Sequence, residues 1–406
     1  MKETGGRMIP VEEALAMILR EAVLLPTERI PLREAAGRVL AETIASDDDQ
    51  PPFRKAMMDG YAVRSADLER IPVELKVVEE VPAGRVPTRC LAAGEAVRIM
   101  TGAPMPEGAD AVQMVERTEP AEDGRKVRIL EGVRPGANVA PRGHDLKKGD
   151  IILAPGRRLS PSCVGLLASV GCCDVPVRRL PRVALAATGD ELVEADRAPR
   201  PGQIRNSNGP ALAALAQRSG ALPSEMGIVG DDLSALDRTL EEGLKSDLLV
   251  LSGGVSMGIH DRVEEALERR GVEIFFRQVA IRPGKPAVFG RKGDCLVFGL
   301  PGNPVSSQVI FEVLTAAALR KMQGVHSPEG KHLEAVLEEP VAQRPGRTGY
   351  LPGSLSFREG TARIRPIPTT GSADLLAHSR ADALLIVPAD RGEIPAGDRV
   401  RALVLE

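Results

Sequence analysis

The sequence predicts a multidomain protein of the α/β plus β class, built around a central, doubly wound and mostly parallel α/β domain. The first observation is that residues 182–323 alternate apolar, strand-like runs with helical runs, which is typical of strands joined by crossover helices. The second is that residues 53–141 and 330–406 contain short segments of alternating polarity separated by turns, which is typical of β-rich domains. With 406 residues, of which 43% are hydrophobic, the chain is long enough for roughly two to four domains.

The elements of the α/β domain follow from its hydrophobic pattern. Apolar runs predict buried strands at 183–187, 225–229 and 248–251, and further strands are expected near 272–279, 286–290 and 295–299. Helices are predicted at 208–219, from Asp231 or Asp232 to about 245, from Asp261 to 270, and from about 304 to 322. Asn208 should cap the first of these helices, since Pro210 lies in its first turn.

The remaining segments indicate how the chain is divided. Helical patterns at 9–22, 31–41 and 161–171 lie on both sides of the β-rich segment, which predicts a discontinuous first domain with a β-rich domain inserted into it. We therefore expect four domains: a discontinuous N-terminal domain, an inserted β-rich domain, the α/β domain and a small C-terminal β domain. Their expected bounds are 1–52 with 142–180, 53–141, 181–327 and 328–406.

The composition argues against several classes of partner. Aromatic residues make up 2% of the chain and Trp is absent, so base stacking cannot be a main mode of binding. The net charge of −3, from 53 basic and 56 acidic residues, provides no overall basic field for nucleic acid or anionic membranes. No apolar run has the length of a membrane span and the N-terminus lacks a signal-peptide core. We expect a cytoplasmic protein that binds neither nucleic acid nor membrane.

The cysteines and histidines do not indicate a disulfide framework or a zinc site. The chain has five Cys, an odd number, and none forms a C-x-x-C pair. Adjacent Cys172 and Cys173 are either a redox pair or, as we favour, two small core residues on a strand. His326 and His332 flank a predicted linker and fit no zinc-ligand spacing.

Three distinctive loops each follow a predicted strand of the α/β domain, at residues 188–191, 252–256 and 299–304. The carboxyl ends of parallel strands meet at one edge of a sheet, where ligands bind, so we expect the three loops to lie together. Gly253 and Gly254 would let the backbone approach an anion closely, and the helix N-termini beyond the loops offer free N–H groups. The sequence therefore predicts an anion-binding site at this edge.

Charged residues are expected at the same edge. Four carboxylates could provide the oxygen ligands that Mg²⁺ prefers beside a phosphate: Asp190, Glu191, Asp231 and Asp261. The turn at 282–286 brings two cations, of Arg282 and Lys285, toward an oxyanion. Each feature by itself has a simpler explanation: the Gly-Gly loop could be an ordinary turn, the aspartates could be helix caps, and the cations could be solvated. Their combination at one edge favours a phosphate and metal site. The absence of Walker A and dinucleotide-binding motifs excludes P-loop enzymes and dinucleotide-dependent dehydrogenases.

A series of motifs runs through the chain in a fixed order, at residues 56–63, 99–103 with 108–112, 142–145, 188–191, 252–258, 282–286 and 299–306. In these motifs the chain resembles the molybdopterin molybdenumtransferase family, which includes the C-terminal half of gephyrin. The resemblance extends over essentially the whole chain, and the complete ordered set leaves little room for coincidence.

The resemblance implies an activity and an assembly. Members of the family are homodimers of four-domain subunits, in which the first domain contributes to dimerisation. Their active site lies between the α/β domain of one subunit and the β-rich domain of its partner. The implied reaction is Mg²⁺-dependent cleavage of the adenylyl phosphoanhydride of adenylylated molybdopterin, with insertion of molybdate at the dithiolene sulfurs and release of AMP. The upstream adenylyltransferase is a further expected partner.

The resemblance also assigns roles to residues of this chain. Catalytic roles fall to Asp59, Thr101, Asp145, Asp190 and Glu191. Substrate-binding roles fall to Gly253, Gly254, Ser256, Arg282, Lys285, Pro301, Asn303 and Ser306, with Arg347 and Ser372 as further candidates. The Mg²⁺ ligands would be Glu191, Asp231 and Asp261.

The chain departs from the family pattern at several positions. His144 stands where Glu is common, so only Asp145 of that motif is carried over. Ile259 and His260 replace a more polar pair, and Arg282 sits where Lys is frequent, which keeps the charge and adds a planar fork.

Two other functions remain open. The related molybdopterin adenylyltransferase shares the α/β domain, but it typically carries a different Gly-rich loop at 252–256 and lacks the other domains. A non-catalytic scaffold of the gephyrin type is the second alternative, and it would not need the acidic edge.

Overall fold

The computed structural model describes residues 7–230, 232–254 and 262–405. Its contacts group the chain into two compact units, each described here by itself. The first comprises Met1–Glu42, Pro155–Pro161 and Asp174–Glu406, and the second comprises Thr43–Ala154 and Ser162–Cys173. Within the described ranges, no helix combines the length and the apolar character needed to cross a membrane.

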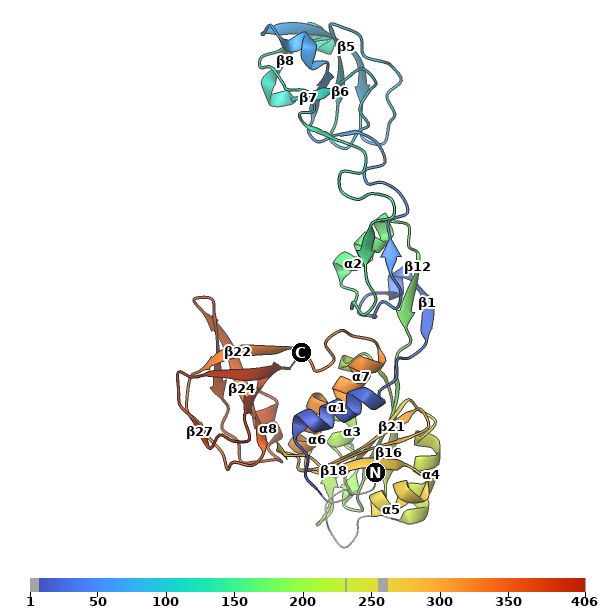
Figure 1. Ribbon diagram of the computed structural model, residues 1–406, viewed down its shortest axis with the longest axis vertical. Coiled ribbons are helices and arrows are strands. Elements are labelled where there is room, and N and C mark those ends of the chain that lie inside the picture. The colour runs from blue at the N-terminus through green and yellow to red at the C-terminus, as the bar shows by residue number, and fades with distance from the viewer. Residues whose placement is uncertain (1–6, 231, 255–261, 406) are drawn as a thin grey trace. The chain divides into compact units, whose positions relative to one another are not determined.

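A six-stranded sheet forms the centre of the first unit, and Figure 1 labels three of its strands, β16, β18 and β21. The strand order is β16-β13-β17-β21-β20-β18. The bounds are β16 (Leu222–Val229), β13 (Arg182–Thr188), β17 (Leu248–Ser252), β21 (Cys295–Leu300), β20 (Pro286–Lys292) and β18 (Glu273–Gln278). The first four neighbours pair in parallel, whereas β20 is antiparallel to both β21 and β18. The predicted mostly parallel α/β fold is confirmed.

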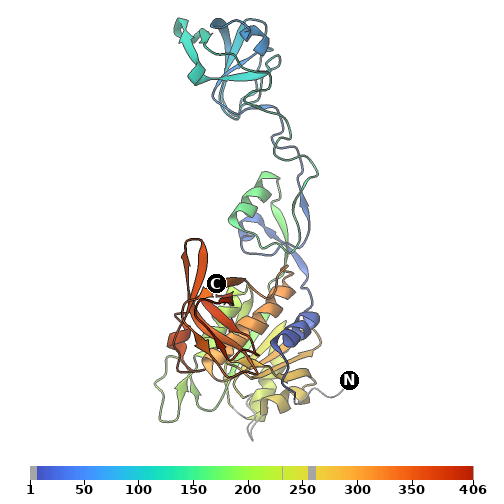
Figure 2. The same cartoon turned by 60° about the vertical axis from the view of Figure 1, so that its left-hand side comes forward.

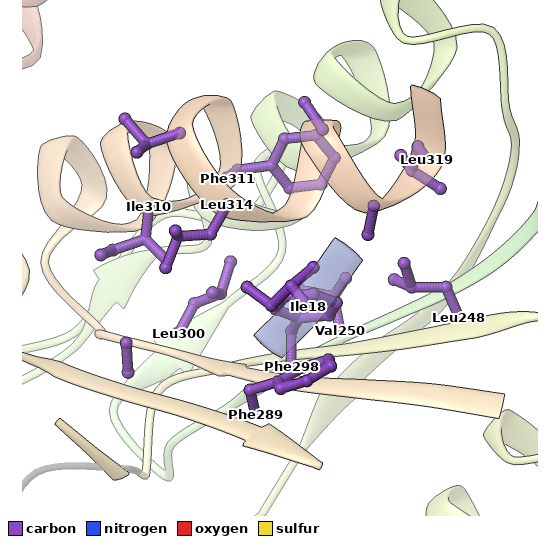
Figure 3. Packing of buried hydrophobic residues seen from close by; sticks show 14 of the residues in the cluster. Ile18, Leu248, Val250, Phe289, Phe298, Leu300, Ile310, Phe311, Leu314 and Leu319 are labelled. Carbon is purple, nitrogen blue, oxygen red and sulfur yellow. The ribbon is translucent and has the colours of Figure 1, made fainter. Parts of the chain in front are cut away.

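Helices cover both faces of this sheet, as a doubly wound fold requires. The helices are α3 (Asn208–Arg218), α4 (Leu233–Gly243), α5 (Arg262–Arg269), α6 (Pro304–Ile310) and α7 (Ala316–Met322), with a π-helical turn, η5 (Phe311–Thr315), joining the last two. Alternate side chains of β17 point to opposite faces. Leu248 and Val250 pack with α3 and the α6-η5-α7 helix on one face. Figure 3 shows these two side chains beneath the α6-η5-α7 helix. Leu249 and Leu251 pack with α4 and α5 on the other face.

The first helix, α1 (Val11–Glu21), belongs to the α/β core and not to a separate N-terminal domain. Its Ala14 and Ile18 are completely buried in the same cluster as β17 and the α6-η5-α7 helix. Figure 3 shows Ile18 among the side chains of this cluster. The expected assignment of residues 1–52 to one domain with 142–180 therefore differs from the structure. The reason is physical: an apolar stripe shows that a helix is buried on one side, but not which sheet covers it.

Two local expectations for the segments around this domain are wrong. Residues 31–41 form only one 3₁₀ turn, η1 (Leu32–Glu34), because Pro31 ends strand β1 (Thr27–Pro31) and Gly37 has a φ of +78°. Strand β1 pairs antiparallel with β12 (Asp174–Arg178). The adjacent cysteines lie between the turn that follows α2 and strand β12, and not on a strand. Cys172 is half-buried and Cys173 is exposed.

The C-terminal β domain, coloured red in Figures 1 and 2, is a closed sheet. Its order is β19-β24-β25-β22-β28-β26, and β26 also pairs with β24, which closes the ring. The bounds are β19 (Ile281–Arg282), β22 (His332–Leu337), β24 (Thr348–Arg358), β25 (Thr361–Pro366), β26 (Ala383–Val387) and β28 (Arg399–Val404), with a short pair of β23 (Val341–Ala342) and β27 (Glu393–Ile394) beside them. Strand β19 belongs to the predicted Arg282 turn, so that turn is tied to the C-terminal domain.

The second unit contains the predicted β-rich module. Six strands form one sheet in the order β7-β4-β6-β5-β9-β8. Their bounds are β4 (Gly60–Val63), β5 (Val73–Val81), β6 (Glu95–Ile99), β7 (Ala111–Met114), β8 (Thr118–Ala121) and β9 (Lys126–Ile129). The module is flanked by the ladders β3 (Lys55–Ala56) with β10 (Val139–Ala140) and β2 (Ile44–Ala45) with β11 (Ile151–Leu153). Helix α2 (Pro161–Ser169) matches the predicted helix, and Gln50 donates to the carbonyl of Ser169 at 2.6 Å.

Candidate active site

A cavity of about 640 Å³ lies at the carboxyl ends of β13, β17 and β21. Its lining includes Thr188 at the end of β13, Gly253 and Gly254 after β17, and Pro301 and Asn303 after β21. All three predicted loops therefore contribute to one hollow, as parallel strands require. The position matches the general ligand site of open α/β sheets.

The Gly-rich loop is pressed against the end of β13. A Cβ atom at Gly253 would lie 2.3 Å from the carbonyl oxygen of Thr188, and one at Gly254 would lie 2.9 Å from its Oγ1. Both glycines have positive φ, +102° and +65°. The amide of Gly253 donates to the carbonyl of Leu300 at 3.0 Å. Glycine is thus required here for close packing between strands as well as for the turn.

A buried polar network ties the loops together beneath the cavity. Asn208 Nδ2 donates to Ser252 Oγ at 2.6 Å and to the carbonyl of Gly302 at 2.9 Å, and Ser252 Oγ lies 3.4 Å from Ser307 Oγ. Asn208 is 9% exposed and lines the cavity. Its expected capping role is wrong, because Ser207 occupies the N-cap and the Asn208 amide spans two loops.

Two carboxylates of the predicted acidic edge are described. A Cβ at Gly230, directly after β16, would lie 3.0 Å from Asp190 Oδ1. Glu191 folds back over Gly189, where a Cβ would lie 2.4 Å from its Oε2, and it lines the cavity. Both side chains are exposed, and their carboxylate oxygens are ligands that suit a hard cation such as Mg²⁺.

The remaining predicted ligands fall outside the described residues. These are Ser256, Asp231 and Asp261. Within the part of the chain that is described, no group of three or more His, Cys, Asp or Glu side chains is arranged to hold a metal. The Mg²⁺ site assigned to Glu191, Asp231 and Asp261 stays a prediction.

A second cavity, of about 470 Å³, contains the predicted oxyanion corner. Its lining includes Arg282, Lys285 and Ser306, together with Arg347 and Ser372 from the C-terminal β domain. The pairing of β19 with β24 places Arg282 in register with Gly349, two residues beyond Arg347. The structure therefore brings both C-terminal candidates to this corner.

The electrostatics of the corner favour an anion. Burial, and then the positive charge of Arg282, lowers the pKa of Arg347 from its ordinary value. The two arginines carry like charges, so a bound anion would relieve their repulsion. Ser372 is held in place, since Asn303 Nδ2 donates to its Oγ at 2.9 Å and Val305 N donates to its carbonyl at 3.1 Å.

The two cavities adjoin. Pro286, Pro301 and Asn303 line both of them. A ligand in the larger cavity can therefore present one end to the oxyanion corner. This continuity is the main geometric feature of the site.

The predicted residues of the β-rich module lie in the second compact unit. Asp59 Oδ1 accepts hydrogen bonds from Thr101 N and Thr101 Oγ1, both at 2.7 Å. These bonds, the backbone one first, lower the pKa of Asp59. Asp145 is exposed, and its Oδ2 lies 3.9 Å from Lys55 Nζ. The structure joins Asp59 to Thr101 but does not bring Asp145 into the same hydrogen-bonded pair.

Sequence reasoning assigned no site role to three residues that line the larger cavity, Arg205, Asn206 and Asn208. Thr188 and Ser252 also line it and begin two of the predicted loops, but they were not singled out as site residues. The polar run at 205–208, directly before a helix, was a signal, but it is equally typical of a helix cap. Only the fold shows that this helix begins at the cavity.

Comparison with known proteins agrees with this architecture. Three family models match: "MoeA N-terminal region (domain I and II)" over residues 9–171, "Probable molybdopterin binding domain" over 184–321, and "MoeA C-terminal region (domain IV)" over 334–405. Molybdopterin molybdenumtransferase of Bacillus subtilis is 33% identical over 404 residues, covering 98% of this chain and 94% of that protein. That of a Nostoc species is 36% identical over 358 residues, covering 86% and 82%.

A solved structure shows the same likeness. The molybdopterin biosynthesis MoeA protein of Pyrococcus horikoshii is 33% identical, covers 98% of this chain and 100% of its own, and superposes with a TM-score of 0.85. The identity and the coverage of these relatives extend across the α/β domain and both β-rich regions. The chain therefore belongs to the molybdopterin molybdenumtransferase family, a family of transferases.

Proposed function

We propose that this transferase inserts molybdenum from molybdate into adenylylated molybdopterin and releases AMP, in the biosynthesis of the molybdenum cofactor. The observation that carries the proposal is the pair of adjoining cavities, one with a Gly-rich loop at the sheet edge and one with Arg282, Lys285 and Arg347. The names of the relatives support it. In this arrangement the substrate occupies the larger cavity and molybdate the smaller one.

The oxyanion corner would hold the molybdate dianion. Two guanidiniums and the Lys285 ammonium supply charge-assisted hydrogen bonds, and the hydroxyls of Ser306 and Ser372 are neutral donors. When the two thiol groups of the substrate's single dithiolene meet molybdate there, two Mo–S bonds form and one Mo–O bond breaks. The two thiol protons leave with that oxide as one water, so no redox partner is needed.

The acidic edge would serve the cleavage step. Water adds to the adenylyl phosphorus, the phosphoanhydride P–O bond breaks, and AMP and the phosphate monoester of molybdopterin result. Asp190 and Glu191 would hold Mg²⁺ with Asp231 and Asp261, and the ion would neutralise charge on the phosphate oxygens. Gly253 and Gly254 line the same cavity, and without a Cβ atom they would let the backbone approach these phosphates closely.

We further propose a homodimer in which the β-rich module of each chain completes the site of its partner. The Asp59–Thr101 pair is the candidate contribution. In the sequence just before Asp59, Phe53, Met57 and Met58 are 41%, 48% and 45% exposed, and exposed apolar side chains of this kind suit a protein contact.

One assay tests the proposed reaction. The protein is incubated with adenylylated molybdopterin, Mg²⁺ and molybdate, and AMP and active cofactor are measured. We expect both products to depend on molybdate. An adenylyltransferase would instead form adenylylated molybdopterin from ATP and release pyrophosphate, and a scaffold would do neither.

A further inference from the structure

Arg205 lines the larger cavity and is not among the residues assigned to the metal, the Gly-rich loop or the oxyanion corner. It belongs to β15 (Ile204–Arg205), which pairs in parallel with β14 (Leu192–Val193) just after the β13 loop. The amide of Ile204 donates to the carbonyl of Glu191 at 2.9 Å. Arg205 is therefore fixed by backbone pairing beside one of the predicted acidic residues.

The guanidinium of Arg205 is oriented by the chain but not neutralised by it. Its Nε donates to the carbonyl of Arg197 at 3.0 Å. A guanidinium has five N–H donors, so this bond holds the group while using one of them. Among the described residues no carboxylate forms an ion pair with Arg205, whereas Arg142 and Arg277, for example, pair with acids. A cation so held at a cavity favours an anionic ligand.

The start of α3 adds to this anion preference, but only weakly. Ser207 caps the helix without a side-chain hydrogen bond, and both Ser207 and Asn208 line the cavity. The helix N-terminus is a positive dipole end. However, Glu225 already lies near the first turn, since a Cβ at Gly209 would be 3.4 Å from its Oε2. Arg205 must therefore provide most of the attraction, because a charged hydrogen bond is stronger than a partly neutralised helix dipole.

The position of Arg205 indicates which anion it binds. Arg205 lines the larger cavity but not the smaller one. Among the described residues, the two cavities share Pro286, Pro301 and Asn303. If molybdate occupies the smaller cavity, the group at Arg205 is a different oxyanion of the substrate. A guanidinium fork matches two oxygens of one phosphate.

We infer that Arg205 binds the phosphate of the adenylyl group, so that β14 and β15 form the nucleotide end of the substrate cavity. The inference rests on the proposed function for the identity of the ligand. It adds a nucleotide subsite to the substrate cavity, in which the charge of Arg205 binds the phosphate of the nucleotide and not its base. AMP, the expected product, should occupy this subsite without molybdate or molybdopterin.

Binding of AMP and of adenosine to the full-length protein tests the inference by calorimetry. Arg205→Gln keeps most of the side-chain length and removes the charge. We expect it to weaken AMP binding about ten- to a hundredfold and to leave adenosine binding unchanged. Arg200→Gln is the matched control, since Arg200 is exposed on the same segment and does not line the cavity, and it should bind AMP like the wild type.

Equal AMP affinity of Arg205→Gln and Arg200→Gln would overturn the inference, as would wild-type protein that binds AMP no better than adenosine. Arg205→Lys, which keeps the charge but not the fork, should fall between the wild type and Arg205→Gln, and it serves if the Gln variant does not fold. A failure of the proposed function can be distinguished from a failure of this inference. A wild-type protein that inserts no molybdenum but binds AMP through Arg205 would contradict the function and keep the subsite.

Discussion

The amide of Asn208 donates to Ser252 Oγ across 2.6 Å and to the carbonyl of Gly302, so one buried side chain joins the start of α3 to two of the three cavity loops. The Oδ1 atom of the same amide is buried without a hydrogen-bond partner among the described residues. The network fixes the distance between the Gly-rich loop and the loop that begins α6.

Asn208→Ala should therefore destabilise the protein and widen the site. Loss of two buried hydrogen bonds predicts a decrease of about 1–3 kcal/mol in the free energy of unfolding. The measurement is urea unfolding of the variant beside Gln217→Ala, an exposed position on the same helix. Equal stability of the two variants would show that the network does not hold the loops.

Gly253→Ala tests the close packing of the Gly-rich loop. The new Cβ would meet Thr188 O at 2.3 Å, and the residue has a φ of +102°. Backbone strain and overpacking together predict a loss of about 2–4 kcal/mol, with loss of AMP formation. Gly271→Ala is the control, because its φ is +73° but no described atom lies within 4 Å of its Cβ. It should cost about 1 kcal/mol and leave activity intact, and an equal effect of both changes would argue against the close packing.

Thr101→Val should raise the pKa of Asp59 toward its ordinary value of 3.8, but only in part. The change removes the hydroxyl donor and leaves the backbone N–H, which is the larger cause of the lowered pKa. Since the folded-state pKa lies below the unfolded one, these bonds stabilise the fold above pH 3.8 and are lost as the pH falls through the folded-state pKa. NMR titration of the Asp59 carboxyl would check this. An unchanged pKa would mean that the hydroxyl bond is not made in solution.

Complementation tests the shared site. Asp59→Ala and Asp190→Ala should each be inactive alone. A heterodimer of the two variants keeps one intact site, formed by Asp190 of one chain and Asp59 of the other, so the heterodimer purified after co-expression should have about half of the turnover of the wild-type dimer. If the purified heterodimer has no activity, each site is built within a single chain.

Much of the architecture could be predicted from the sequence, for reasons specific to its elements. The runs at 183–187 and 248–251 are apolar throughout, which marks strands buried on both faces, and the loop after each strand must reach the same edge. The helix at 11–21 was equally visible, but its apolar stripe could not show that it covers the α/β sheet. The hydrophobic pattern of an element shows which of its sides is buried, but it does not show which other element packs against that side.

The side-chain contacts of the site could not be predicted in this way. Arg205 and Asn208 occupy a run that is also typical of a helix cap, and their partners Arg197, Ser252 and Gly302 are set by tertiary packing. The turn at 282–286 could be predicted as cationic, because its charges are local. Arg347, some sixty residues along the chain, was a candidate through the family resemblance alone, and its place beside this turn is explained by the pairing of β19 with β24.

The oxyanion corner is the centre of this account, and the molybdate dependence of Lys285→Ala tests it most directly. AMP formation is measured at saturating adenylylated molybdopterin and Mg²⁺ while molybdate is titrated. Lysine 292, exposed at the end of β20 and outside both cavities, provides the control Lys292→Ala. Loss of one charge-assisted hydrogen bond of roughly 1.5–3 kcal/mol predicts a molybdate requirement about ten- to a hundredfold higher for Lys285→Ala only. An unchanged molybdate dependence of Lys285→Ala would contradict the account and place the oxyanion elsewhere along the edge.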